Sequence, residues 1–389
     1  MRQRVERMHD GSRARLTPLL STFFALSLLP VVASCGGDNG GGGASSVIVF
    51  NGENNRLSAY DARTFEKQIV IHSSNDIPDY GRDINAQICF FPDGSRRFIA
   101  GEDTNQPNPL QGWGIFQLYG QTVGELSAQE IGKLTPTYQG SADNAENYGC
   151  GFLSDGTALT TDVGNQAAGP GDGQLIIWFP PFDRPPAEQH YCKLDIGIAT
   201  AGGIWVDASD HIYVASARGG DMPGGGRVLR YSPPFPTSDD ASGGCGQHDG
   251  TGAPLADSVT MDTFILDQTN VPTPSAIVQT RSGTFYVSSV FNGVIAEYDA
   301  NGQFVRTILA PPMAGLPPFP TGTPFGIGLD SSGTLYYADI GIVINPPDIG
   351  PGRNAGTVRR IRFENGEPQA PETMDQGLNF PDGIGVLEE

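Results

Sequence analysis

Residues 324–339 read PFGIGLDSSGTLYYAD, and this stretch decides the fold. Two short apolar runs, Ile327–Leu329 and Leu335–Tyr337, flank the polar turn Asp330–Gly333. Apolar runs joined by a turn of this composition are typical of an antiparallel β-hairpin. A further run with apolar alternation follows at Gly356–Phe363, so the unit is predicted to continue as a third strand.

The same unit recurs upstream, which makes the chain a repeat protein. Hairpins that align on the turn glycine or its equivalent cover residues 88–100, 150–162, 204–215 and 277–288. Third strands are predicted at 114–118, 174–179, 227–231, 294–298 and 357–363, and the clearest fourth strand at 303–309. Four short antiparallel strands per repeat predict the blade of a β-propeller.

The two ends of the chain supply one more blade. Residues 47–50, 56–61 and 67–72 have the pattern of second, third and fourth strands, but no first strand precedes them. Residues 381–386 have the pattern of a first strand with nothing after it. Each half leaves open hydrogen-bonding edges, and each can complete the other. We therefore predict an all-β fold, a six-bladed β-propeller of four-stranded antiparallel blades whose last blade pairs the C-terminal strand with the N-terminal strands.

The pattern Pro-x-Gly-Ile-x-x-Asp-x-x-Gly-x-x-Tyr-x-x-Asp resembles the NHL repeat, and more loosely the SMP-30/gluconolactonase group of six-bladed propellers. The resemblance spans the chain after its N-terminal segment and is clearest at 203–231, 274–309 and 324–363. It implies a fold rather than a function, because one propeller ring hosts hydrolases, lyases and binding platforms.

Composition and charge limit the classes of partner that the protein is expected to bind. The formal net charge is −20, which repels phosphate backbones and makes nucleic acid an unsuitable partner. The same charge disfavours an anionic membrane surface, so any membrane association is expected to come from a lipid anchor. The 53 glycines and 31 prolines suit an all-β chain with many turns.

The N-terminal segment resembles a bacterial lipoprotein signal. Residues 1–34 carry an arginine-rich start and a short apolar core, and Val32–Cys35 resembles a lipobox. The resemblance implies lipidation of Cys35, a glycine-rich tether over 35–46 and a propeller over 47–389. Gly36 resembles the outer-membrane sorting default, so the predicted location is the outer membrane of a bacterial envelope. An ordinary secretory signal is the alternative.

The candidate site lies where the inner strands begin, because this end of a propeller channel is the face used for ligands. The residues expected at this mouth are Asn85, Ala86, Asn147, Tyr148, Gly202, Ser275, Phe325 and Asp382. Arg218, beside Gly219, Gly220 and Asp221, ends a second strand and can grip a carboxylate ligand in two hydrogen bonds or pair with Asp221. Asp162 and Asp339 are expected to cap turns. The apolar, proline-rich loop 311–324 is expected on the same face.

Three functions remain open at this point. The first is a lipid-anchored envelope protein that binds a partner protein or a small ligand at the channel mouth. The alternative is a metal-dependent hydrolase of the lactonase type, in which Asp382, Asn85 and Asn147 hold Ca²⁺ or another divalent metal. The lactonase pattern also needs a glutamate that no inner strand here carries, and the sequence identifies no catalytic residue. A structural envelope scaffold is the third.

Four cysteines follow Cys35, and an exported protein with an even number of them is expected to form disulfides. Cys192 and Cys245 both lie at the periphery, which favours a bond between them. Cys89 and Cys150 lie on adjacent inner strands, but their aligned positions differ by one. This offset would point their side chains apart and favours buried free thiols.

Overall fold

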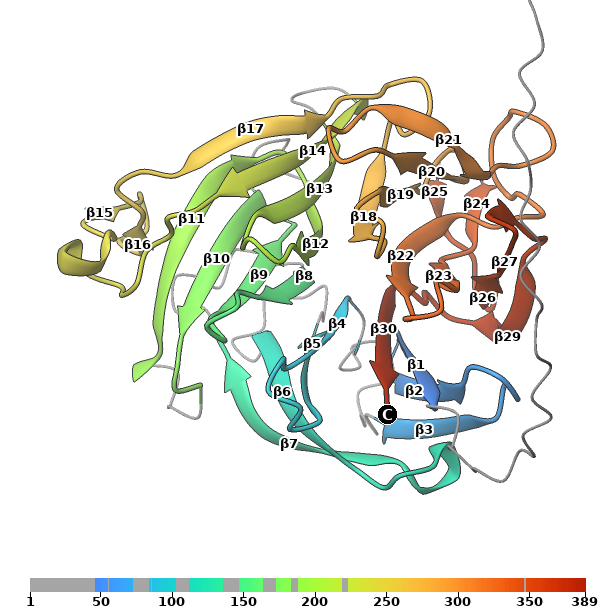
Figure 1. Ribbon diagram of the computed structural model, residues 1–389, viewed down its shortest axis with the longest axis horizontal. Coiled ribbons are helices and arrows are strands. Elements are labelled where there is room, and N and C mark those ends of the chain that lie inside the picture. Colours follow the sequence, from blue (N-terminus) through green and yellow to red (C-terminus); the bar gives the residue numbers. More distant parts are fainter. Residues whose placement is uncertain are drawn as a thin grey trace, which may run out of the picture. The chain divides into compact units, whose positions relative to one another are not determined.

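Six antiparallel sheets, taken in chain order, surround a common centre in the computed structural model (Figure 1). The structure describes residues 46–54, 56–72, 84, 86–102, 112–135, 147–163, 173–182, 188–218, 223–345 and 348–389. The signal segment, Cys35 and the tether through residue 45 lie outside these residues, as do Asn85 and Asp221. Within the described ranges, no helix is both long and apolar enough to cross a membrane.

Each blade consists of consecutive strands that pair with their neighbours. Blade 1 is β4 (Ile88–Phe90), β5 (Arg97–Glu102), β6 (Gly112–Tyr119) and β7 (Ser127–Leu134), with the 3-10 turn η1 (Val123–Glu125) before β7. Blade 2 is β8 (Asn147–Phe152), β9 (Ala158–Asp162), β10 (Gly173–Phe179) and β11 (His190–Ile198). Blade 3 is β12 (Ala201–Val206), β13 (Ile212–Arg218), β14 (Pro223–Ser232) and β17 (Thr260–Ile265).

The second half of the chain repeats this arrangement. Blade 4 is β18 (Pro274–Gln279), β19 (Phe285–Ser289), β20 (Val294–Tyr298) and β21 (Phe304–Leu309). Blade 5 is β22 (Pro324–Leu329), β23 (Leu335–Asp339), β26 (Gly356–Ile361) and β29 (Glu372–Leu378). Two small hairpins accompany it, β24 (Ile342–Asn345) with β25 (Asp348–Pro351) and β27 (Phe363–Glu364) with β28 (Glu367–Pro368).

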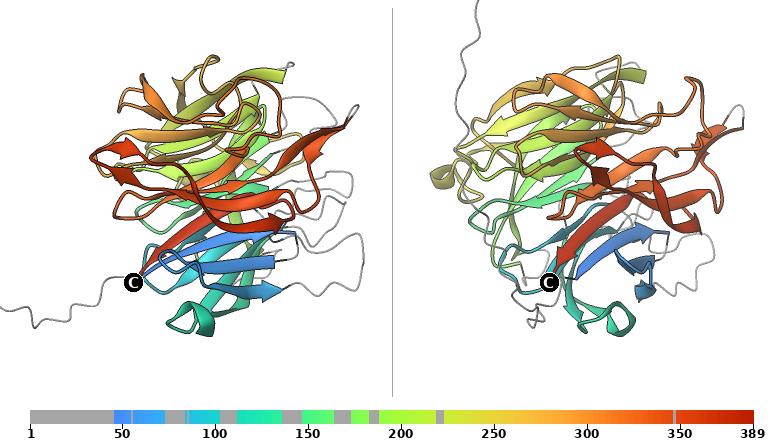
Figure 2. Two further views of the ribbon diagram at one scale, coloured as in Figure 1. Left: turned by 90° about the vertical axis from the view of Figure 1, so that its right-hand side faces the viewer. Right: turned by 45° about the vertical axis from the view of Figure 1, so that its right-hand side comes forward.

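The closing blade joins the two ends of the propeller, as the sequence predicts. It consists of β30 (Gly383–Glu388), β1 (Val47–Glu53), β2 (Arg56–Asp61) and β3 (Lys67–His72). In the antiparallel register, Val386 lies opposite Val49, and Ile384 lies opposite Asn51. Figure 2 shows the red C-terminal strand beside the blue N-terminal one in both views. This pairing makes the six inner strands a closed cycle, β30, β4, β8, β12, β18 and β22.

The hairpin turn at Asp330–Gly333 is stabilised by the aspartate and the glycine that mark it in the sequence. Asp330 Oδ1 accepts hydrogen bonds from the backbone N–H groups of Ser332 and Thr334, at 2.9 Å each. Gly333 has a φ of +88°, which a residue with a side chain rarely adopts. The turn therefore needs an acceptor at its start and a glycine near its end.

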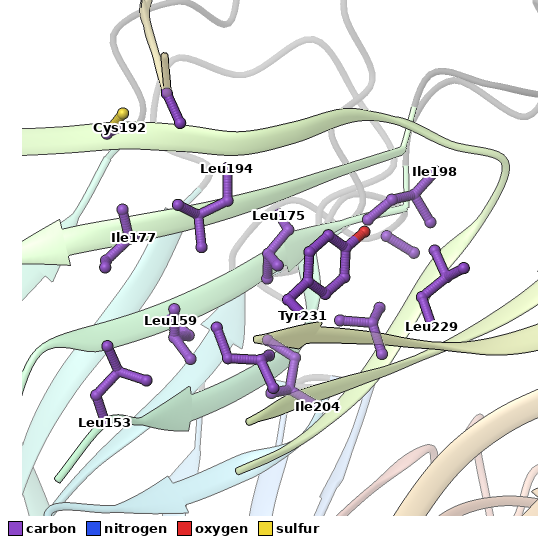
Figure 3. Packing of buried hydrophobic residues seen from close by; sticks show 14 of the residues in the cluster. Leu153, Leu159, Leu175, Ile177, Cys192, Leu194, Ile198, Ile204, Leu229 and Tyr231 are labelled. Atoms are coloured by element: carbon purple, nitrogen blue, oxygen red, sulfur yellow. The ribbon is translucent and has the colours of Figure 1, made fainter. Parts of the chain in front are cut away.

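Apolar side chains between neighbouring blades hold the ring together. Between blades 2 and 3, Leu159, Leu175 and Ile177 pack against Leu229 and Tyr231, and all five are almost completely buried (Figure 3). Similar clusters lie between the other neighbouring blades. Burying one large apolar side chain stabilises the folded state by about 1.5–3 kcal/mol, so these contacts are the main source of stability.

The long connection after β14 extends blade 2 outward. It contains η3 (Ala241–Gly243), β15 (Gln247–His248) and β16 (Pro254–Leu255), and β16 pairs in parallel with β11. The disulfide between Cys192 and Cys245 fixes this insertion to β11 and confirms the predicted bond. Lys193 and Asp249 form an almost completely buried ion pair beside it.

The expectation for the other two cysteines is wrong, because Cys89 and Cys150 form a second disulfide. In β4, Ile88 packs toward the closing blade and Cys89 toward blade 2. Cys150 aligns with Ile88, so it lies on the side of β8 that faces blade 1. Neighbouring blades contact each other through opposite faces of their sheets, and successive residues of a strand point to opposite faces, so the offset of one position brings the two side chains together.

Candidate channel-mouth pocket

A cavity of about 160 Å³ lies where the inner strands begin. We call it the channel-mouth pocket. Its described lining comes from blades 2 to 5 and the closing blade: Asn147, Tyr148, Val163, Thr200, Ala201, Gly202, Ala217, Arg218, Pro274, Ser275, Val290, Phe291, Phe325, Ile340, Phe380 and Asp382. The structure thus brings together the predicted residues Asn147, Tyr148, Arg218, Ser275, Phe325 and Asp382. The predicted Asn85 lies outside the described residues.

The pocket residues at the start of the inner strands lie where the pairing between first and second strands is irregular. The pairing between first and second strands shifts near Tyr148, Gly202, Ser275 and Phe325. Such bulges redirect side chains and free backbone groups from the sheet ladder. Two freed N–H groups find hydroxyl acceptors: Gly149 N donates to Thr161 Oγ1 (2.7 Å), and Ala276 N donates to Ser288 Oγ (3.1 Å). Four blades therefore use a local irregularity to shape the pocket.

Tyr148 lines the pocket from β8 of blade 2. Its ring meets Phe325, on the opposite blade, edge to face with the ring centroids 4.7 Å apart. Its hydroxyl donates to the backbone oxygen of Asp382 at 3.1 Å. Burial, and then the nearby charge of Asp382, raise the pKa of Tyr148 well above its usual value. Tyr148 is therefore a neutral phenol that connects blades 2, 5 and the closing blade.

The backbones of neighbouring inner strands approach one another closely next to the pocket-lining residues. Gly383 lies so near blade 1 that an added Cβ would overlap the backbone oxygen of Ala86. The Gln87 side chain ties blades 1, 2 and 3 together: its Oε1 accepts from Cys150 N (3.2 Å) and Ile204 N (2.9 Å). The inner strands thus form a rigid support for the side chains above them.

Asp339 caps the start of β22, as predicted. Its Oδ1 accepts from Thr323 N at 2.7 Å and from Gly341 N at 3.0 Å. Its Oδ2 accepts from Thr357 Oγ1 at 2.9 Å. This buried carboxylate links the segment before Phe325 to the end of β23 and to β26, so it positions one wall of the pocket without lining it. Asp162 is equally buried at the end of β9.

The residues described here do not fit a divalent metal. Asp382 is buried and is the only carboxylate of the described lining, and its Oδ1 accepts from Ala86 N at 2.9 Å. Asn147 Nδ2 donates to the Gly112 oxygen at 3.2 Å. Ca²⁺ takes six to eight oxygen ligands. Across the described ranges, no three His, Cys, Asp or Glu side chains form a group that could hold a metal ion.

Arg218 has a different environment. It is half-buried at the end of β13 and is the only cationic side chain in the described lining. In the part of the chain that the structure describes, no carboxylate pairs with its guanidinium. The surrounding wall is mostly apolar. Arg218 thus gives the described lining its one positive charge.

A second tier of apolar residues was missed by the sequence reasoning. Val163, Val290 and Ile340 directly follow the second strands of blades 2, 4 and 5, and Ala217 lies near the end of the equivalent strand in blade 3. Phe380 lies just before the closing strand. Their position in the repeat could have identified the four strand-end residues, because each directly follows a polar residue: Asp162, Ser216, Ser289 or Asp339.

Exposed apolar side chains from blades 3 and 4 and from the connection between β21 and β22 lie at this end of the propeller. Leu266 follows β17 and is 67% exposed, and Phe291, on the pocket wall, is 46% exposed. In the connection from β21 to β22, Met313 is 80% and Leu316 is 75% exposed. This connection lies within the loop predicted to present apolar surface. Its position between β21 and the start of β22 places it beside the mouth.

No protein-family model matches the sequence, and no curated protein matches it significantly. Solved structures do resemble it. The structure of a nidogen/laminin complex aligns over 87% of this chain and 98% of its own, with 12% identity and a TM-score of 0.51. A Bacteroides caccae protein of unknown function covers 89% and 100%, with 13% identity and a TM-score of 0.49.

The regucalcin of Agrobacterium tumefaciens, described as a calcium-binding protein, aligns over 76% of this chain and 85% of its own. Its identity is 13% and its TM-score 0.45. At such low identity, structural likeness establishes the fold and no activity. The sheets described above and the likeness to the nidogen/laminin structure identify a six-bladed β-propeller.

Proposed function

We propose that this propeller is a lipid-anchored protein of the bacterial cell envelope that binds a partner protein or a small ligand through its channel-mouth face. The observation that carries the binding role is the channel-mouth pocket itself. A mostly apolar cavity with a few convergent polar groups is the usual form of a ligand site. Exposed apolar side chains beside it add surface for a larger partner.

The comparison with nidogen agrees with this role. That protein was solved in a complex with laminin, and its propeller resembles this one in fold. The Lewis-acid route of the alternative hydrolase has no comparable support, because the described lining offers Asp382 as its single carboxylate. Stoichiometric divalent metal in the purified protein, lost in Asp382→Asn, would favour the hydrolase.

Site-specific photocrosslinking in the native host tests the binding face. The photoreactive residue p-benzoylphenylalanine replaces Leu316 on the mouth face or, as the matched control, the exposed Arg281 in a turn at the opposite end of blade 4. We expect a discrete envelope adduct from position 316 and none from position 281. Equal crosslinking from both positions, or none from position 316, would argue against a protein partner on this face.

The lipid anchor is tested separately. A clickable fatty acid fed to the host should label the wild-type chain and leave Cys35→Ala unlabelled. The variant should leave the membrane fraction when cells are lysed. Labelling that persists in Cys35→Ala, or an unlabelled wild type, would refute the proposed anchor.

A further inference from the structure

We infer that the ligand of the channel-mouth pocket carries a carboxylate next to an aromatic ring, with the carboxylate bound by Arg218. This inference rests on the proposed function and specifies its chemistry. Arg218 is half-buried in the lining, and within the described residues no acidic side chain pairs with it. A guanidinium presents two parallel N–H donors to a carboxylate, which gives both affinity and orientation.

The apolar wall indicates the other end of the ligand. Val290, Phe291 and Ile340 line the pocket with the Phe325 ring. These side chains come from blades 4 and 5, whereas Arg218 comes from blade 3. A ligand that spans the cavity therefore meets a cation on one side and aliphatic and aromatic surface on the other. Aromatic rings pack on such surfaces with centroids about 4.5–7 Å apart.

The size of the cavity agrees with a single ring. Its volume is about 160 Å³. An apolar protein cavity of roughly 150 Å³ is known to bind benzene. One aromatic ring with a short acidic arm reaching Arg218 matches this space, whereas a nucleotide or an oligosaccharide exceeds it.

Asp382 sets the orientation of the ligand. Asp382 is a buried residue of the pocket lining, and its carboxylate accepts a hydrogen bond from Ala86 N at 2.9 Å. A second carboxylate placed next to it would be repelled in this poorly solvated region. The acidic end of the ligand is therefore directed away from Asp382, on the closing blade, and toward Arg218, on the opposite blade 3.

Two sources can supply this chemistry, a free aryl acid or the C-terminal aromatic residue of a protein. Calorimetry on the full-length protein with N-acetyl-L-phenylalanine, and with its amide as the matched neutral control, tests the shared chemistry. We expect the acid to bind at least tenfold more tightly than the amide. Equal affinities, or no measurable binding of the acid, would overturn the inference.

Variants assign the effect to one side chain. Arg218→Gln should bring the ratio of acid to amide affinity close to one and leave amide binding unchanged. Arg218→Lys should keep a preference for the acid, and Arg281→Gln, outside the pocket, should match wild type. An acid preference that survives in Arg218→Gln would exclude Arg218 as the carboxylate ligand. The thermal melting temperature of each variant checks that the ring is intact.

Peptides distinguish the two sources. A tetrapeptide that ends in phenylalanine with a free carboxylate should bind more tightly than N-acetyl-L-phenylalanine if the natural ligand is a protein terminus. Weaker binding of the peptide assigns the pocket to a small aryl acid. Failure of every acid, while position 316 still crosslinks a partner, would refute the ligand class and leave the proposed binding face standing.

Discussion

At the scale of single residues, the polar side chains near the pocket divide into those that hold the backbone and those that face the cavity. Asp339 accepts from Thr323 N, and in blade 4 Ser289 Oγ accepts from Thr273 N at 3.1 Å. Asp339 and Ser289 occupy equivalent positions, and each accepts a hydrogen bond from a backbone N–H just before an inner strand, Asp339 with a carboxylate and Ser289 with a hydroxyl. Arg218 has no comparable task among the described residues, which is why it is the more informative side chain for function.

Loss of the Asp339 cap should be costly because the site is buried. Asp339→Ala leaves the N–H groups of Thr323 and Gly341 without their acceptor, and we expect a loss of about 2–3 kcal/mol in the free energy of unfolding. Asp299→Ala is the matched control, since Asp299 caps an exposed turn through Asn301 N and Gln303 N. Urea denaturation measures both. A loss no larger than that of the control would contradict the structural role.

The buried pair Lys193–Asp249 predicts a pH dependence. Burial opposes ionisation of Asp249, but hydrogen bonds from Lys193 and Thr251 outweigh it and lower the pKa from 3.8 to about 2. The folded state thus favours the ionised carboxylate. Its contribution to stability is complete above pH 4 and is lost as the pH falls through about 2.

Asp249→Asn tests this dependence because it leaves the Lys193 ammonium buried without a counter-ion. We expect a loss of about 3–5 kcal/mol at pH 7, and the difference from wild type should shrink as the pH approaches 2. Asp262→Asn, which breaks an exposed pair with Arg230, should cost under about 1 kcal/mol. A difference between Asp249→Asn and wild type that is constant with pH would contradict the assignment.

At the scale of elements, the hairpins and the ring positions could be predicted because each repeat marks them with the same spacing. The second tier, Val163, Val290 and Ile340, could not be predicted as readily. Apolar residues at these places look like ordinary continuations of a strand. The Cys89–Cys150 bond was missed because neighbouring blades meet through opposite faces of their sheets, so two residues one position apart in the aligned repeats face each other.

The insertion between β14 and β17 should depend on its disulfide. The bond Cys192–Cys245 closes a segment with a sequence separation of 53 residues, and removing such a bond typically costs about 2–4 kcal/mol. Because the insertion packs outside the ring, Cys192→Ser with Cys245→Ser should speed proteolytic cleavage within 233–259. Cys89→Ser with Cys150→Ser should leave cleavage there unchanged. Equal cleavage rates in both variants and in wild type would contradict this prediction.

At the scale of the whole molecule, the chain ends determine whether a ring exists. Their complementary, incomplete patterns allowed the closing blade and its pairing partners to be predicted from the sequence. The pocket follows from this closure, because Asp382 and Phe380 reach the mouth only when β30 is placed beside β1. The ligand could not be inferred from the repeats, which describe the scaffold, and it had to be argued from the side chains that the scaffold brings together.

Hydrogen exchange of the full-length protein, followed by mass spectrometry, tests this closure most directly. Amides of Val47–Glu53 and Gly383–Glu388 should be protected as strongly as those of the inner strands of blades 3 to 5, and the two segments should open together under mild denaturant. Rapid exchange in either segment while blades 3 to 5 stay protected would show that the ends do not form a blade, and it would remove the basis for the channel-mouth pocket.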